Sequence, residues 1–204
     1  MKVILSLAMA VTVFGSTSLM AIEEAKYRVV LADGPIEIRD YEPSIVAETV
    51  VSGDFEEAGD DAFGRLFRYI GGNNVSQEKI AMTAPVSQER SEKIAMTAPV
   101  EQRPAADGWA VSFMMPASYT IKTIPKPKDD SVAIREIPAY RAAAIRYSGF
   151  WSEKNYREHL AELNAWLDAT GYRRAGEPVW ARYDAPFKPW FMRRNEILIP
   201  VEDG

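Results

Sequence analysis

The residue types that most often carry protein chemistry are scarce in this sequence of 204 residues, which has one histidine, His159, and no cysteine. The lack of cysteine excludes disulfides, zinc fingers, iron–sulfur ligation and a thiol nucleophile, and one histidine excludes a His–His metal site. The 24 basic and 29 acidic residues give a net charge of -5 without a basic block, so nucleic acid is not an expected partner. These counts leave binding, or chemistry with unusual residues.

Residues that could act in catalysis lack the neighbours that catalysis requires. Ser52 and Ser148 each precede a glycine, but neither has the Gly-x-Ser-x-Gly elbow of a serine hydrolase. The acidic pair Glu56-Glu57 precedes an apolar helical pattern, where carboxylates stabilise the positive end of the helix dipole. We therefore predict that the protein is not an enzyme.

The elements that would position any binding residues occur twice in the same order. Extended segments are predicted in two pairs, 36–41 with 45–51 and 132–137 with 141–147, and a Ser-Gly pair follows each. An amphipathic helix is predicted after each Ser-Gly pair, with apolar residues at 63, 66, 67 and 70, and at 156, 160, 163 and 167. This shared order predicts an internal duplication, with repeats at about 27–116 and 130–201.

Further strands are predicted at 109–115, 177–183 and 195–201. Many short strands with two helices indicate an α+β fold with a largely antiparallel, curved or barrel-like sheet.

A second repeat is an identity of nine residues. Glu-Lys-Ile-Ala-Met-Thr-Ala-Pro-Val occurs at 78–86 and again at 92–100. In an extended segment its Ile and Met share one face, which predicts two neighbouring strands with a Met-lined inner side. A ligand-binding surface rich in adaptable methionine is the alternative.

The first 21 residues have the layout of a secretory signal peptide. Lys2 is followed by an apolar stretch of about a dozen residues and then by small residues up to a plausible cleavage site at Ala21. We expect export to the periplasm, with secretion possible, and one domain at 26–204 that has no membrane association once the leader is removed. A monomer is favoured.

Three sequence motifs occur together: Tyr69-Ile70-Gly71-Gly72-Asn73, the repeated Lys-Ile-Ala-Met-Thr-Ala-Pro-Val, and the C-terminal Tyr183-Asp184-Ala185-Pro186 with Arg193-Arg194-Asn195-Glu196. In this combination they resemble the SOUL heme-binding protein family. The resemblance runs from about 27 to 201 and implies a distorted antiparallel β-barrel, built from a duplicated strand–helix–strand–strand unit and flanked by two α-helices. It also implies non-covalent, non-enzymatic binding of heme or a related tetrapyrrole in a shallow hydrophobic pocket. The doubled motif departs from the single-copy eukaryotic pattern, which puts the local strand register in doubt.

The resemblance places the ligand contacts on the first helix and in a C-terminal loop. It implies that Phe63 and Phe67 line the pocket, and that Arg68 and Lys188 reach the propionates of the tetrapyrrole. Successive residues lie about 100° apart around a helix, so Arg68 must reach back to this face and Arg65 competes with it. The alternatives are that both rings belong to the ordinary core and that Lys188 is a solvated loop charge.

Two residue types could ligate a heme iron. His159 lies at the edge of the apolar face of the second helix, where a histidine is more often structural, so it is a weak candidate for the axial ligand. Spacing prefers none of the methionine candidates, which are Met82, Met96, Met114, Met115 and Met192.

The sequence therefore leads to one main interpretation and two alternatives. The main one is tetrapyrrole binding for buffering, transport or scavenging. An effector-type module on the same duplicated fold would instead bind amphipathic molecules or hydrophobic cations in a deep acidic or aromatic cavity between the halves. The third is an interaction protein whose Met-rich repeat binds a partner strand.

Overall fold

The computed structural model describes residues 22–77 and 90–202. The predicted leader at 1–21 and the first copy of the nine-residue motif, with Met82, lie outside the described residues.

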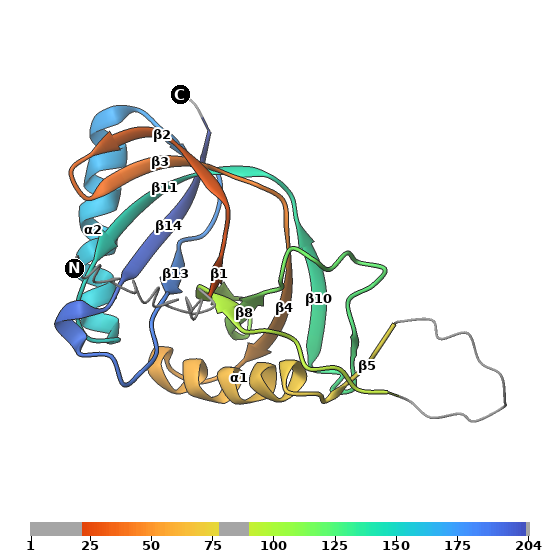
Figure 1. Ribbon diagram of the computed structural model, residues 1–204. Coiled ribbons are helices and arrows are strands. Elements are labelled where there is room, and N and C mark those ends of the chain that lie inside the picture. The colour runs from red at the N-terminus through yellow and green to blue at the C-terminus, as the bar shows by residue number, and fades with distance from the viewer. Residues whose placement is uncertain (1–21, 78–89, 203–204) are drawn as a thin grey trace, which may run out of the picture.

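One large antiparallel sheet curls into a half-barrel (Figure 1). Across the sheet its strands are β10 (Val132–Ile137), β4 (Ser44–Val51), β8 (Gly108–Met114), β7 (Val100–Ala105), β13 (Val179–Arg182), β14 (Asn195–Glu202), β11 (Tyr140–Tyr147), β3 (Ile36–Tyr41) and β2 (Tyr27–Asp33). The short β12 (Arg173–Arg174) pairs with β14, β1 (Glu23–Glu24) runs parallel to β6 (Thr97–Ala98), and β5 (Asn74–Val75) pairs with β9 (Lys126–Pro127). The predicted α+β class with a curved antiparallel sheet is confirmed.

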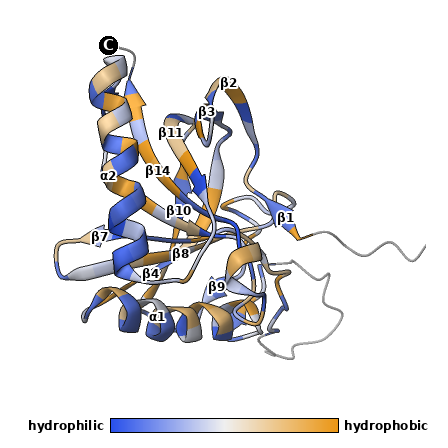
Figure 2. Ribbon diagram, turned by 90° about the vertical axis from the view of Figure 1, so that its left-hand side faces the viewer, coloured by the Kyte–Doolittle hydropathy of each residue, from blue (hydrophilic) through white to orange (hydrophobic). Residues whose placement is uncertain are grey.

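Two helices cover the outer side of the sheet (Figure 1). α1 (Phe55–Ile70) packs on β4, β8 and β10, whereas α2 (Glu153–Thr170) packs on β11 and β14. In Figure 2 both helices alternate hydrophilic and hydrophobic segments, as expected for helices with one buried face. The order strand–strand–helix therefore occurs in both halves, and the duplication itself stays a prediction.

The helix ends follow the local sequence. The Asp54 carboxylate accepts hydrogen bonds from the backbone N–H groups of Glu56 (3.1 Å) and Glu57 (2.9 Å), and Ser152 caps α2 in the same way. At the other end of α2, Gly171 adopts a left-handed conformation (φ 82°), which glycine adopts without steric cost.

Alternation along the strands gives the sheet two chemically different sides. On β8, Val111 and Phe113 face α1 in the core, so Ser112 and Met114 face the hollow of the half-barrel. Their cross-strand partners follow the same rule, since Glu101 on β7 is opposite Ser112. The hollow side therefore carries polar as well as apolar groups.

The second copy of the nine-residue motif is mostly irregular. Within it Thr97–Ala98 forms β6 and Val100 begins β7, and the Thr97 hydroxyl donates to the backbone carbonyl of Met114. Ile94 is 5% exposed and Met96 is 39% exposed, so the two do not share a face as predicted. The reason is that the strand begins only after Met96, and period-two alternation does not extend to the residues before it.

Candidate functional site

The predicted aromatic pair lies on one face of α1. The rings of Phe63 and Phe67 stack with centroids 5.8 Å apart, and Phe63 also meets the edge of Phe113 at 5.2 Å. Phe63 is partly buried, whereas Phe67 is 52% exposed. The first ring is thus anchored in the core and the second presents apolar surface to solvent.

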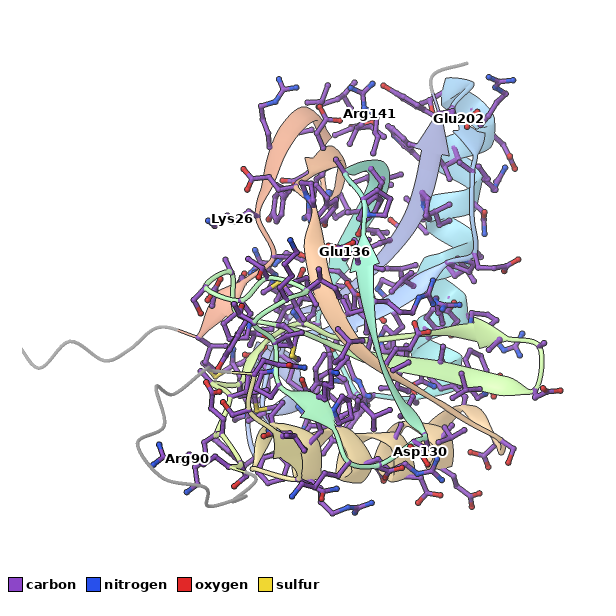
Figure 3. The ribbon with its side chains drawn as sticks, turned by 90° about the vertical axis from the view of Figure 1, so that its right-hand side faces the viewer. Lys26, Arg90, Asp130, Glu136, Arg141 and Glu202 are labelled. Carbon is purple, nitrogen blue, oxygen red and sulfur yellow. The ribbon has the colours of Figure 1, made fainter. Side chains whose placement is uncertain are left out.

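Basic residues lie beside this pair, toward the end of α1. Arg68 is exposed, and its Nη1 lies 3.7 Å from the position that a Cβ atom would occupy at Gly64, one turn earlier. Hydrogen bonds from Ser131 lower the pKa of Asp129, and the charges of Arg65 and Arg68 lower it further. The turn before β10 therefore approaches both arginines, as the place of Asp130 beside α1 also shows (Figure 3).

The predicted C-terminal contact lies in the loop between β13 and β14. The Lys188 ammonium forms an ion pair with Asp184 at 2.6 Å, so this lysine already has a protein partner. Its neighbours form an exposed aromatic surface, in which Phe187 is 90% exposed and Trp190 stacks on Phe150 at 5.1 Å. A bound anion would compete with Asp184 for the lysine.

This loop lies at the opposite end of α1 from Arg68. The backbone N–H of Gly149 donates to the Trp190 carbonyl (3.1 Å), which fixes the loop beside the start of α2. The start of α2 in turn meets the start of α1, where the Glu153 N–H donates to Glu56 (3.4 Å). Phe67 lies about 16 Å further along α1 because an α-helix rises 1.5 Å per residue. Among the described residues, no hydrogen bond, ion pair or ring contact joins the lysine to the aromatic pair.

The candidate iron ligands lie in different places. His159, on α2, has its Nδ1 3.0 Å from the Asn155 carbonyl, and its ring stacks on Tyr147 at 4.0 Å. Met114 and Met115 are buried, and Met96 and Met192 are exposed. The structure brings none of these residues to the Phe63–Phe67 pair through a ring contact or hydrogen bond within its described part.

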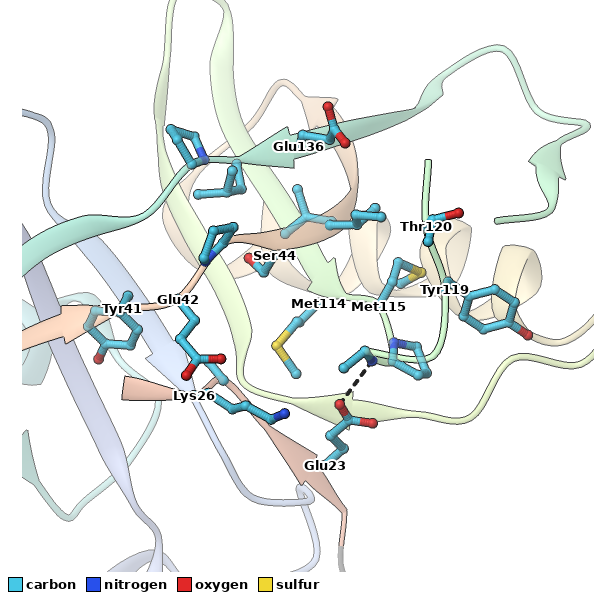
Figure 4. Close-up of a pocket in the computed structure, with 18 of the residues that line it drawn as sticks. Glu23, Lys26, Tyr41, Glu42, Ser44, Met114, Met115, Tyr119, Thr120 and Glu136 are labelled. Atoms are coloured by element: carbon cyan, nitrogen blue, oxygen red, sulfur yellow. Dashed lines mark hydrogen bonds between the residues drawn. The ribbon is translucent and has the colours of Figure 1, made fainter. Parts of the chain in front are cut away.

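A cavity of about 790 Å³ opens on the hollow side of the sheet, away from the helices (Figure 4). Its volume is typical of small-molecule sites. Its apolar wall includes Tyr41, Ile45, Val46, Met114, Met115, Ile137 and Tyr140, and its charged groups are Glu23, Glu24, Glu42, Glu101, Glu136, Lys26 and Lys122. The sequence foretold none of these residues as a site, apart from the two methionines, because the wall is assembled from five segments far apart in the chain.

Glu101 is the most perturbed acid of the cavity. It lies on β7, and the Ser112 hydroxyl donates to its carboxylate over 3.4 Å. Burial raises the pKa of Glu101 to about 7. The sequence gives one indication that Glu101 is unusual. The residue after the final valine of the repeated motif is Ser87 in the first copy and Glu101 in the second.

Comparison with known proteins identifies the family. The sequence model of the SOUL heme-binding proteins matches residues 22–200. The chain belongs to the SOUL heme-binding protein family. Heme-binding protein 1 of Xenopus tropicalis is 30% identical over 162 residues, which cover 79% of this chain and 80% of that protein. Human heme-binding protein 2 is 28% identical over 174 residues, 80% of each chain. The family resemblance drawn from the motifs is confirmed.

The fold of this SOUL protein also occurs outside the family. The crystal structure of the EcmrR C-terminal domain superposes with a TM-score of 0.55 at 18% identity, over 87% of this chain and 99% of that one. At this identity the likeness shows a shared fold.

Two further properties of the SOUL chain concern residues 22–77 and 90–202. These residues contain no group of three or more His, Asp or Glu side chains that could hold a metal ion. They also contain no helix that is long and apolar enough to cross a membrane.

Proposed function

We propose that the protein binds heme or a related tetrapyrrole non-covalently on the face of α1 that carries Phe63 and Phe67, and that it catalyses no reaction. The observation that carries this proposal is the stacked Phe63–Phe67 pair, in a chain whose family and relatives are named for heme binding. Phe63 is held by Phe113, so Phe67 is presented on a rigid support. A flat apolar ligand can cover Phe67 without a rearrangement of the core.

The charges near the pair suit the tetrapyrrole. When bound, heme supplies an iron centre and two propionates, which favour basic partners. Arg65 and Arg68 would hold the propionates beside the end of α1, whereas Lys188, paired with Asp184 toward the other end of the helix, would remain a loop charge outside this contact. His159 would remain optional, because its Nδ1 already lies against a backbone carbonyl.

The cavity on the hollow side suits this dianion poorly. Five carboxylates and two lysines line it, so it carries an excess of negative charge that repels propionates. This contrast favours the α1 face as the tetrapyrrole site.

The proposed role is buffering, transport or scavenging of the tetrapyrrole in the periplasm. This role rests on the signal-peptide layout of residues 1–21 and on the lack of catalytic groupings in the sequence.

Titration of the purified protein with hemin tests the proposal. We expect a saturable Soret shift, and an affinity about tenfold or more weaker when Arg65→Ala and Arg68→Ala are combined. The matched control is Arg28→Ala with Arg146→Ala, since both arginines are exposed and lie on strands of the sheet, away from α1. If the first double variant binds hemin as tightly as the unmodified protein, the propionate assignment is wrong, and absence of saturation refutes the function.

The axial ligand is tested separately. His159→Ala should change the ferric spectrum if this residue ligates the iron, and an unchanged spectrum removes it from the iron.

A further inference from the structure

The glutamates on the hollow side of the sheet differ in their partners. Glu48 forms ion pairs with Arg103 (2.8 Å) and Arg135 (2.6 Å). Glu196 is likewise paired with Arg39 (2.6 Å) and Arg194 (2.9 Å). Each of these buried carboxylates is therefore neutralised by two guanidinium groups.

Glu101 has no such partner. Among the described residues it forms no ion pair, and the Ser112 hydroxyl at 3.4 Å is its one hydrogen-bond donor. Glu101 nevertheless lines the cavity of about 790 Å³. A largely desolvated carboxylate without an ion-pair partner is costly in a folded protein, and the charge of Arg103 offsets that cost only in part. A cation in the cavity would supply the missing partner.

The walls around Glu101 suit a cation with an apolar body. Tyr41 and Tyr140 stack almost in parallel, with centroids 4.9 Å apart and an interplanar angle of 8°, and both line the cavity. Aromatic faces attract cations, and a methionine side chain adapts to irregular apolar shapes. The sulfur end of Met114 and the carboxylate of Glu42 point into the same space (Figure 4).

The remaining cavity carboxylates are closer to the opening or already engaged. Glu23 accepts a hydrogen bond from the Ala117 N–H at 2.9 Å, drawn in Figure 4, and Glu24 pairs with Arg194 at 2.7 Å. Glu136 is exposed on β10, at the edge of the sheet (Figure 3). They add negative potential to the opening, which attracts a cation, whereas Glu101 lies deeper.

We propose that this cavity is a second ligand site, distinct from the α1 face, which takes a monovalent organic cation with an aromatic or other apolar body, and that Glu101 is its counter-charge. The site is independent of the proposed tetrapyrrole site because the two lie on opposite sides of the sheet. The ligand proposed here is a cation, whereas the tetrapyrrole carries two negatively charged propionates.

Ethidium is a suitable probe because it is a planar aromatic cation whose fluorescence rises in an apolar environment. At about pH 8 we expect saturable binding with a dissociation constant in the micromolar range, roughly 1–100 μM. Glu101→Gln should weaken it by about tenfold or more, since this change removes the charge and keeps the shape. The matched control is Glu162→Gln, at an exposed position on α2 outside the cavity, which should change the affinity by less than about threefold.

The pH dependence gives a second readout. The charged and titratable groups facing Glu101 are Arg103 on its own strand, Glu48 on β4 and Tyr140 on β11, with Lys26 and Lys122 on the cavity wall. Ethidium affinity should rise with pH through about 7, as Glu101 loses its proton, and then level off. The Glu101→Gln variant should lack this rise.

Three results would overturn the proposal. They are equal ethidium affinity in the Glu101→Gln variant, no saturation up to about 1 mM ethidium, and displacement of ethidium by an anionic aromatic sulfonate of similar size. Circular dichroism of the Glu101→Gln variant establishes that it is folded. Excess hemin should leave bound ethidium in place, which separates this test from that of the α1 face.

Discussion

Replacement of Phe67 by alanine is the sharpest test of the α1 face, because its effect can be worked out from exposure. A phenylalanine side chain buries roughly 150–250 Å² when covered. Phe67 is 52% exposed, so about 100 Å² remains for a ligand to cover. At about 25 cal/mol per Å², full coverage contributes about 2.5 kcal/mol, or roughly 60-fold in affinity, and half coverage about eightfold.

The expected result is therefore a dissociation constant for hemin raised by about eightfold to 60-fold, measured by Soret titration. Val29→Ala is the control, since Val29 is 43% exposed on β2, at the edge of the sheet far from α1 (Figure 1). Circular dichroism should show both variants folded, because each side chain is substantially exposed. A dissociation constant within about twofold of the unmodified value for Phe67→Ala would refute the assignment of this ring to the ligand.

Three further predictions concern stability, each measured by urea unfolding. Glu196→Gln should lower the free energy of unfolding by about 2–4 kcal/mol, because the buried Arg39 then keeps only the partly exposed Glu37 as its counter-charge. Asp168→Asn, in an exposed pair, should cost less than about 1 kcal/mol. Burial raises the pKa of Glu101 from 4.5 to about 7, so the native state retains a proton that the unfolded chain loses. Stability should then fall by up to about 3 kcal/mol as pH rises from about 5 to 7, and Glu101→Gln should abolish this slope. Gly108→Ala should cost about 2 kcal/mol or more, because Gly108 has φ 133° and an added Cβ would lie 2.2 Å from the Val51 carbonyl oxygen; a loss below about 0.5 kcal/mol would contradict this reasoning.

Local sequence patterns predicted the elements whose boundaries depend on neighbouring residues. The strands at 36–41 and 132–137 occur with the predicted bounds, and both helices contain all of the apolar positions from which they were predicted. The alternation of apolar and polar residues along a strand, the 3.6-residue period of apolar residues along a helix, and the residues that cap a helix are all local properties of the sequence. They can therefore be recognised without the rest of the fold.

Two of the longer strands, β2 and β7, were not predicted, and the reason is again physical. β2 is an edge strand in which Val29, Val30 and Leu31 are all exposed, so its sequence does not alternate between a buried and a solvated side. β7 includes Pro104 and carries polar residues toward both sides of the sheet. Their place in the sheet depends on pairing with distant strands.

The sequence by itself determined the α+β class, the family and the aromatic face of α1, because motifs and periodicity are written along the chain. Only the tertiary structure decided how the side chains are used. It buried Phe63 while leaving Phe67 exposed, and it paired Lys188 with Asp184. It also assembled the acidic cavity from segments far apart in the chain and left Glu101 there without an ion pair to any described residue, because burial and charge pairing depend on contacts that no local pattern contains.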